Sequence, residues 1–303
     1  MKKIIITGAT GFIGGAIAKK LLSEGNIVYG IDINADKLEE MKQYGSFVPI
    51  VADFSMYDRL EELINDRTFD LCIHTAWKGM IGGKDLYDHI LQNESVKASC
   101  RLCEACATIG VKRFIFCGSS YQEMVSKDLL LPTNYYGIAK KFAASYCLAI
   151  SAREGMECNI AILTNTYGPG DRSQKAVNTF IRKLLAQEPL DLIDGYNRND
   201  WCYIDDTVAG ILATAESRQS YKEYYIGHVD ISRFRDKLIQ MKEVLGSNSE
   251  LRFGKFIDNT FVDYDRINLS ALENDTGFKC ETDFKKSILL TAEWIKKLDN
   301  IRS

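Results

Sequence analysis

The sequence predicts an α/β protein in which a doubly wound parallel sheet is followed by a smaller C-terminal α+β domain. Short runs rich in β-branched and aromatic residues alternate with helical segments through the first half of the chain, which is the pattern of βαβ units. A glycine-rich loop joins the first run to the first helical segment. The expected strands are residues 3–7, 27–32, 47–51, 71–74, 114–117 and 159–163.

The helical segments 14–23 and 90–109 carry apolar residues at three- and four-residue spacing, as helices packed on one face of a sheet do. After Tyr167 the alternation becomes irregular, with isolated helices and short strands. We therefore expect a first domain over residues 1–166 and a second over 167–303. Some segments of the second are expected to return to the first.

Length, composition and charge restrict the partners. The 303 residues are 46% hydrophobic and 26% charged, the mix of a globular protein, and the formal net charge of −3 offers no polycation for nucleic acid. No run of about eighteen apolar residues occurs, so we expect no membrane span and a cytoplasmic protein. The nine cysteines lie mostly in apolar periodic segments, which indicates reduced and buried thiols.

The glycine-rich loop runs from Gly8 to Gly14, at the amino terminus of the first helix. Gly8 lets the strand turn sharply, Gly11 lets backbone amides approach a pyrophosphate, and Gly14 lets the helix pack close to the strand. We therefore expect residues 1–166 to form a Rossmann-type dinucleotide-binding domain and residues 167–303 to bind mainly the substrate. The loop residues expected to contact the cofactor are Gly8, Thr10, Gly11, Phe12, Ile13 and Gly14.

Asp32 ends the second expected strand, where an acidic side chain binds the adenosine ribose hydroxyls of a dinucleotide. A carboxylate at this point repels a 2′-phosphate, so the sequence favours NAD over NADP. Lys37, five residues later, is the residue that would reverse this preference.

Tyr136 and Lys140 form a second motif. Their four-residue spacing on a helix puts a phenol and an ammonium one turn apart on the same face. A nearby ammonium favours the phenolate, so we expect the pKa of Tyr136 to fall toward working pH and the phenol to exchange a proton with a hydroxyl. The preceding strand runs into Ser119 and Ser120, at the sheet edge where open α/β proteins bind ligands.

Several motifs, taken in their order along the chain, resemble those of extended short-chain dehydrogenases/reductases, in particular the nucleotide-sugar epimerase/dehydratase family. The resemblance covers nearly the whole chain. It rests on the glycine loop, Asp70-Leu71-Cys72-Ile73-His74-Thr75-Ala76, Asn93 in the next helix, Pro132 with Tyr136 and Lys140, Asn165-Thr166-Tyr167-Gly168-Pro169-Gly170, and Tyr203-Ile204-Asp205-Asp206.

This resemblance implies an enzyme in which Tyr136 is the acid/base, Lys140 holds the nicotinamide ribose and Ser119 hydrogen-bonds the reacting oxygen. Ser120 is the alternative to Ser119. Hydride passes between a sugar carbon and the nicotinamide. The other cofactor contacts that the resemblance implies are Asp53, Phe54, Thr75, Ala76 and Asn93. The substrate contacts are Trp77, Ser120, Tyr121, Asn165, Arg198 and Trp201.

One departure from the family pattern concerns the reaction. Ser119-Ser120-Tyr121 stands where the 4,6-dehydratases of the family carry Thr-Asp-Glu, and Glu123 is out of register. Elimination of water needs that acid and base, so a dehydratase is disfavoured. The short segment between Ser119 and Tyr136 is similar to that of compact 4-ketoreductases of the family, such as abequose synthase.

A second departure concerns the substrate diphosphate. Family members often carry an arginine where this chain has Asn199, two residues before an aromatic side chain. Arg198, Arg172 and Lys175 are candidates to bind the phosphates instead, but the spacing does not choose among them.

The cysteines and histidines do not predict a metal site. Cys100, Cys103 and Cys106 are spaced as in some iron–sulfur proteins, but they lie on a continuous helical pattern. A buried or dimer-facing helix surface is therefore expected. The three histidines are not in ligand spacing with one another, and we expect no metal.

Three functions of different class remain open. The leading one is NADH-dependent reduction of a 4-keto-6-deoxy nucleotide sugar, and the second is a nucleotide-sugar 4-epimerase that keeps NAD bound. The third is a non-catalytic dinucleotide sensor, which the intact Ser119, Tyr136 and Lys140 disfavour. By analogy with the family, we also expect a homodimer formed by the helix after Asn93 and the helix with Lys140.

Overall fold

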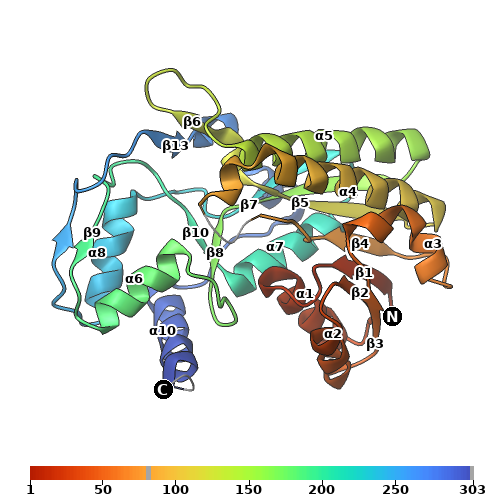
Figure 1. Cartoon of the computed structure of the whole chain (residues 1–303), viewed down its shortest axis with the longest axis horizontal. Coiled ribbons are helices and arrows are strands. Elements are labelled where there is room, and N and C mark those ends of the chain that lie inside the picture. Colours follow the sequence, from red (N-terminus) through yellow and green to blue (C-terminus); the bar gives the residue numbers. More distant parts are fainter. Residues whose placement is uncertain (80–82, 301–303) are drawn as a thin grey trace.

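The structure is a computed structural model that describes residues 1–79 and 83–300. Its centre is a seven-stranded parallel sheet of order β11-β7-β5-β4-β1-β2-β3 (Figure 1). The predicted doubly wound parallel sheet is confirmed. Its strands are β1 (Lys3–Thr7), β2 (Ile27–Asp32), β3 (Phe47–Val51), β4 (Leu71–His74), β5 (Arg113–Ser119), β7 (Glu157–Leu163) and β11 (Lys222–Ile226).

Helices cover both faces of this sheet (Figure 1). Side chains alternate between the two faces, so Ile4 and Ile6 of β1 join one apolar core and Ile5 joins the other. Because both faces are buried, the strands are almost wholly apolar. One face packs on α1 (Phe12–Ser23), α2 (Ala35–Met41) and α7 (Ile204–Glu216), and the other on α3 (Leu60–Leu63), α4 (His89–Thr108) and α5 (Tyr135–Glu154).

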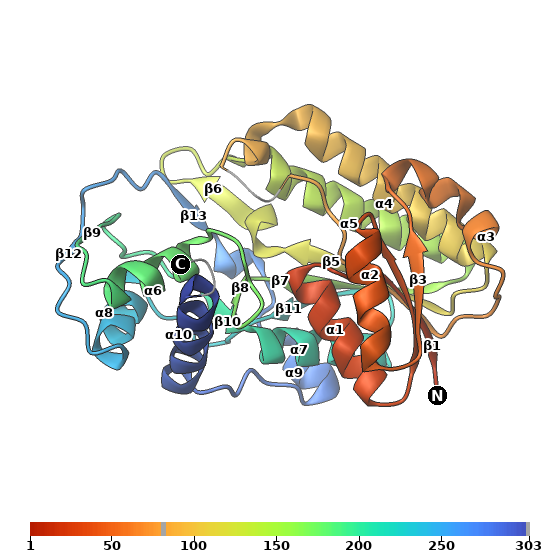
Figure 2. The same cartoon turned by 60° about the horizontal axis from the view of Figure 1, so that its bottom comes forward.

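The later part of the chain forms smaller units at one end of the molecule (Figure 2). Three helices gather there in both views, with short strand pairs beside them. The helices are α6 (Ala176–Leu185), α8 (Phe234–Val244) and α10 (Phe284–Asn300). The paired strands are β8 (Asn165–Tyr167) with β10 (Trp201–Tyr203), and β9 (Leu190–Asp191) with β12 (Leu251–Arg252).

Two segments from this later part return to the sheet. β11 pairs with β7 at the edge of the sheet, and α9 (Ala271–Thr276) packs on β11 and α7. These elements lie after residue 166, within the segment assigned mainly to a second domain. Within residues 1–79 and 83–300, no helix combines the length and apolar character that crossing a membrane requires.

The segment after β5 is held above the carboxyl edge of the sheet. It forms a short 3₁₀ helix, η4 (Ser120–Glu123), and then β6 (Met124–Ser126), which pairs antiparallel with β13 (Thr260–Val262). This pairing ties the region before α5 to the C-terminal part of the chain. The carboxyl ends of β1, β4 and β5 therefore face a site with contributions from both parts.

Candidate active site

The glycine loop makes the tight turn that the sequence predicts. Gly8 has a φ of +68°, in the left-handed region, and its amide donates to the Ile31 carbonyl at 2.9 Å. A Cβ on Gly14 would lie 2.2 Å from the Gly8 carbonyl oxygen and 2.7 Å from Thr75 Oγ1. The start of α1 thus lies directly against the end of β1, at a distance that only glycine allows.

The amino terminus of α1 suits an anion. Its N-cap is Gly11, no side chain caps the helix, and the first turn carries no acidic residue. The backbone amides and the positive end of the helix dipole therefore meet no competing side-chain acceptor at this terminus. Phe12 and Ile13 open the helix and pack against the core beside it. These features fit the pyrophosphate of a dinucleotide.

Asp32 lies beside this loop. One carboxylate oxygen accepts from the Thr10 amide at 3.0 Å, and the other accepts from the Ile33 amide at 2.8 Å and the Asn34 amide at 3.3 Å. The carboxylate is half-buried and its orientation is set by the backbone. Lys37 lies on the exposed side of α2, after the Asn34 cap. The arrangement fits ribose hydroxyls and leaves a negative charge where a 2′-phosphate would lie.

Replacing Asp32 by Ser is expected to reduce the preference for NADH over NADPH by about 10- to 100-fold, because it removes a like charge next to the 2′-phosphate. The ratio of the two dissociation constants, measured by fluorescence titration, tests this. Glu39→Gln is the matched control, since Glu39 is an exposed carboxylate of α2 that pairs with Lys42. An unchanged ratio in the Asp32 variant would contradict the assignment.

Four further predicted cofactor residues follow β3 and β4. Asp53 accepts from the Ser55 amide at 2.7 Å, and it begins the 3₁₀ helix η2 (Phe54–Arg59). Thr75 Oγ1 donates to the Thr7 carbonyl at 2.7 Å, and the Ala76 amide lies next to Gly8. Thr75 and Ala76 are thus in contact with the glycine loop.

Asn93 is not brought to this cluster. It is exposed on α4, whereas Gln92 and Ser95 are buried on the inward side. Ser95 Oγ accepts from the amide of Lys78, in the loop after β4. Asn93 is two positions from Ser95, about 200° around the helix, so the assignment to Asn93 misjudged the phase of the helix.

Tyr136, Lys140 and Ser119 lie together at the carboxyl edge of the sheet. Tyr136 is on the first turn of α5, which Asn134 caps, and Ser119 ends β5. All three side chains are buried, with 3%, 4% and 8% exposed. Gly137 allows this approach, because a Cβ there would lie 2.0 Å from the Tyr121 carbonyl oxygen. Sequence reasoning missed this glycine, although it stands inside the Tyr136–Lys140 motif.

The pKa of Tyr136 does not follow the prediction of a lowered value. Burial raises the pKa of the phenol well above its usual value, and the Ser119 side chain opposes this only in part. Burial also lowers the pKa of Lys140 to about 7. The expected depression considered only the neighbouring ammonium, whereas the removal of water from both groups dominates here.

Aromatic rings surround the phenol. Trp77 meets the Tyr136 ring edge to face at 6.1 Å between centroids, and Tyr121 meets it at 6.2 Å. Ser119 Oγ accepts from the Tyr121 amide at 3.2 Å, while the buried Ser120 Oγ has no hydrogen-bond partner in the described protein. A buried hydroxyl without a partner fits a ligand hydroxyl or carbonyl, so Ser120 stays a candidate beside Ser119.

The structure separates the other predicted substrate residues. Asn165 is half-buried, and its amide donates to the Asp200 carbonyl at 3.2 Å. Arg198 pairs with Asp265 at 2.6 Å and is partly exposed, so its guanidinium is engaged by a carboxylate. Trp201 is 3% exposed and packs in the apolar core of the C-terminal part. It packs there with Phe234 and Phe284, and it does not join the cluster around Tyr136.

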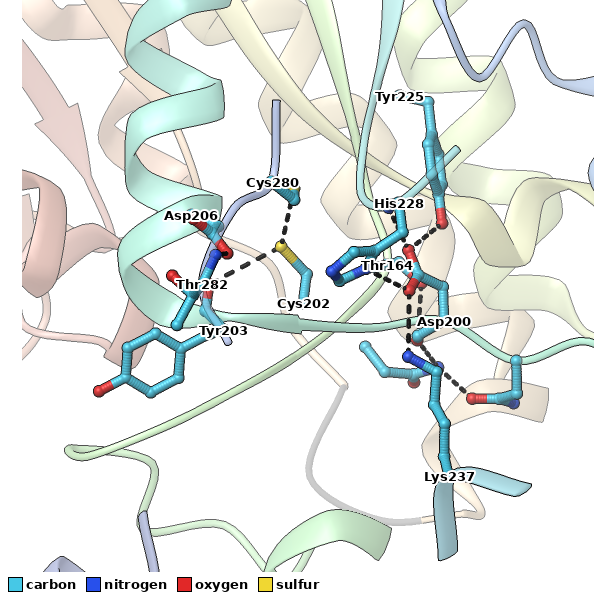
Figure 3. A network of polar contacts seen from close by, with 12 residues as sticks. Thr164, Asp200, Cys202, Tyr203, Asp206, Tyr225, His228, Lys237, Cys280 and Thr282 are labelled. Atoms are coloured by element: carbon cyan, nitrogen blue, oxygen red, sulfur yellow. Dashed lines mark hydrogen bonds and ion pairs between the residues drawn. The ribbon is translucent and has the colours of Figure 1, made fainter. Parts of the chain in front are cut away.

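Asp200 organises a buried network that sequence reasoning did not find (Figure 3). Its carboxylate accepts from Tyr225 Oη at 2.7 Å and from the amide and Nδ1 of His228 at 2.8 Å each, and it lies 3.7 Å from Lys237 Nζ. Burial raises its pKa, but the contacts of His228 and the charge of Lys237 outweigh burial and hold the pKa below its usual value. The network supports the backbone to which Asn165 binds.

Comparisons with known proteins agree with this geometry. The sequence model described as “NAD dependent epimerase/dehydratase family” matches residues 4–227. A UDP-glucuronate 4-epimerase of Thermodesulfobacterium geofontis is 23% identical over 229 residues, covering 69% of this chain and 70% of that protein. The uncharacterized UDP-glucose epimerase YtcB of Bacillus subtilis is 27% identical over 284 residues, covering 86% and 89%.

A solved structure shares the fold. The UDP-glucuronic acid 4-epimerase from Bacillus cereus, in complex with UDP-glucuronic acid and NAD, superimposes with a TM-score of 0.79 at 24% identity. The superposition covers 98% of this chain and 99% of that one.

Proposed function

Because the chain belongs to the NAD-dependent epimerase/dehydratase family, we propose that it reduces a 4-keto-6-deoxy nucleotide sugar with NADH. Enzymes of this family act on nucleotide sugars, and the three side chains that carry the proposal are Ser119, Tyr136 and Lys140. The observation that supports reduction best is the buried cluster of these three side chains, in which the Tyr136 phenol is 3% exposed and carries its hydroxyl proton at neutral pH. A reductase needs that proton for the ketone oxygen.

The chemistry requires a hydride and a proton. NADH, when bound, supplies the hydride to the carbonyl carbon. Tyr136 gives its hydroxyl proton to the carbonyl oxygen, which becomes the hydroxyl of the product. Ser119 or Ser120 orients that oxygen by a hydrogen bond, and the Lys140 ammonium, 5.9 Å from the Tyr136 ring centroid, stabilises the phenolate that remains.

Dehydration finds no support at this site. The positions after Ser119 hold a hydroxyl and a phenol, and the partial burial of Tyr121 raises the pKa of its phenol. Glu123, the nearby carboxylate, pairs with Lys141 at 2.6 Å. Elimination of water needs a separate acid and base on the sugar, which these residues do not provide.

A nucleotide-sugar 4-epimerase is the second candidate, because the relatives described above are epimerases by name. An epimerase must turn its keto sugar over between two hydride transfers. Trp77 and Tyr121 pack against the Tyr136 ring, so the keto sugar of an epimerase would have to turn over beside these rings. A ketone that is reduced on one face needs no such turn.

Assays on the purified full chain distinguish the candidates. We expect loss of NADH absorbance on addition of a 4-keto-6-deoxy nucleotide sugar, and little NAD(H) retained after extensive dialysis. Stoichiometric NAD(H) that survives dialysis, together with 4-epimerisation of UDP sugars without added cofactor, would establish the epimerase instead. NADH binding with neither reaction would point to the dinucleotide sensor.

We also propose a homodimer formed through the outer faces of α4 and α5. Large apolar side chains are exposed there, with Ile90 at 64%, Phe142 at 56% and Tyr146 at 51%. Burial of such a patch between two copies removes it from water. Light scattering at micromolar concentration should give twice the chain mass, and Phe142→Asp should shift the population toward monomer. A monomeric parent protein would refute this proposal.

A further inference from the structure

Lys140 is a buried ammonium whose surroundings contain no acidic partner. Its Nζ donates to the Cys117 carbonyl at 2.7 Å, and its side chain is enclosed between β5 and α5. In the part of the chain that the structure describes, no carboxylate forms an ion pair with it. Burial of a charge without a counter-charge is costly and lowers the pKa of Lys140 to about 7, so any neighbour that stabilises the ammonium changes the charge of this site at neutral pH.

Aromatic rings supply that stabilisation. The Lys140 Nζ lies 3.9 Å from the centroid of the Trp77 ring, 4.9 Å from that of Phe116 and 5.9 Å from that of Tyr136. The negative face of an aromatic ring attracts a cation within about 6 Å, and tryptophan is the strongest of the three. Trp77 is therefore the main aromatic partner of the ammonium.

The indole is held in place by its own hydrogen bond. Trp77 Nε1 donates to Gln92 Oε1 at 2.8 Å, and the Gln92 amide donates to the Asp85 carbonyl at 2.9 Å. Gln92 is 1% exposed on α4. A buried amide that is hydrogen-bonded through both its oxygen and its nitrogen fixes which face of the indole meets Lys140.

We propose that Trp77 is a positioning residue whose indole face keeps Lys140 as an ammonium beside Tyr136, in place of the carboxylate that the site lacks. Only the catalytic consequence rests on the proposed function, because the contact itself needs neither substrate nor cofactor. Trp77 thereby helps to set the charge state of Lys140, which governs the proton that Tyr136 carries.

The other titratable groups around Lys140 cannot play this part. His74 on β4 is neutral, since burial lowers its pKa to about 3. Burial raises the pKa of the Cys117 thiol on β5 to about 12, and the pKa values of Tyr136 and Cys147 on α5 are raised as well. None of these groups is an anion at neutral pH.

The indole has two opposing effects on the charge. Its bulk excludes water, which favours the neutral amine, and its ring face stabilises the ammonium. Phe and Leu have similar size and apolar character, but only Phe has a ring face. A comparison of Trp77→Phe with Trp77→Leu therefore separates the ring from the exclusion of water.

The experiment is an NMR titration of the cofactor-free protein labelled with ¹³C at lysine Cε, with the Lys140 signal assigned by Lys140→Met. We expect the pKa of Lys140 to be highest in the parent protein, lower in Trp77→Phe and lowest in Trp77→Leu. The fall from parent to Leu should be about one pH unit, a tenfold lower ratio of ammonium to amine. The high-pH limb of kcat/KM should move to lower pH by the same amount.

Equal pKa values in the Phe and Leu variants would overturn the inference, and so would a higher value in Trp77→Leu, which would mean that the indole acts only by excluding water. Far-UV circular dichroism and the denaturation midpoint confirm that each variant is folded. If Trp77→Leu does not fold, the comparison of the parent protein with Trp77→Phe still tests the inference. An unchanged pKa of Lys140 in Trp77→Phe contradicts the expected order. The NMR result holds whether or not a 4-keto sugar is the substrate, so the two proposals fail separately.

Discussion

Tyr136→Phe should lower kcat by about 1,000-fold and leave the dissociation constant of NADH within about twofold of the parent value. The substitution removes the hydroxyl proton and keeps the ring that packs between Trp77 and Tyr121. Since the phenol is 3% exposed, water has little access to replace it as the acid. Single-turnover measurements of NADH oxidation give the rate, and fluorescence titration gives the affinity.

Tyr135→Phe is the matched control for this prediction. Tyr135 is the adjacent residue of α5, but its side chain is 46% exposed and it packs against Tyr87 and His89 at the surface. Its loss of a hydroxyl should leave kcat within about twofold. A Tyr136→Phe protein that turned over at the parent rate would remove Tyr136 from the mechanism and leave the dinucleotide-binding loop without its catalytic partner.

The fold was largely readable from the sequence because the central strands are apolar on both faces. The runs around Ile4 and Ile73 stand out against polar loops, and six of the seven sheet strands were predicted from such runs. β11 was missed because Lys222 and Glu223 begin it, so only its last residues are buried, and because it follows a stretch of irregular chain. Its place in the sheet depends on pairing with β7. The paired residues Lys222 and Asn159 are 63 positions apart in the sequence.

The sequence predicted the site residues whose type is required by backbone geometry. It predicted less well the properties that depend on the packing of side chains. Gly8 and Gly14 are required by close contacts, and the Tyr136–Lys140 spacing follows from the helix. The predicted direction of the Tyr136 pKa shift was wrong, because the burial of the phenol depends on residues outside α5, which include Ser119 of β5, Tyr121 of η4 and Trp77 after β4. A pattern along one helix does not contain that information.

The network around Asp200 shows the same limit. His228 follows β11 and Lys237 lies on α8, yet both reach the Asp200 carboxylate. No local spacing connects these three residues. A Cβ on Gly227 would lie 2.2 Å from Asp200 Oδ2. The requirement for glycine beside His228 therefore comes from a contact that forms only in the folded chain.

Gly14→Ala should weaken NADH binding by about 100-fold or more and destabilise the fold by about 1–3 kcal/mol. The added methyl group would lie 2.2 Å from the Gly8 carbonyl oxygen and 2.7 Å from Thr75 Oγ1. The backbone oxygen belongs to a residue with a φ of +68°, so relief of the clash must displace the turn that presents the amides at the start of α1. Both the packing and the anion site therefore depend on the same missing methyl group.

Gly15→Ala provides the comparison within the same helix turn. A Cβ there meets its nearest neighbour, the Ala9 carbonyl oxygen, at 3.4 Å, which is close to ordinary contact. Because alanine is the better helix former by up to about 1 kcal/mol, this variant should be as stable as the parent or slightly more so, with NADH affinity retained. Denaturant unfolding and NADH titration of the two variants measure both effects. Equal losses at Gly14 and Gly15 would show that the first turn of α1 tolerates no side chain at all, and the contact with Gly8 would then not be the reason for the glycine at position 14.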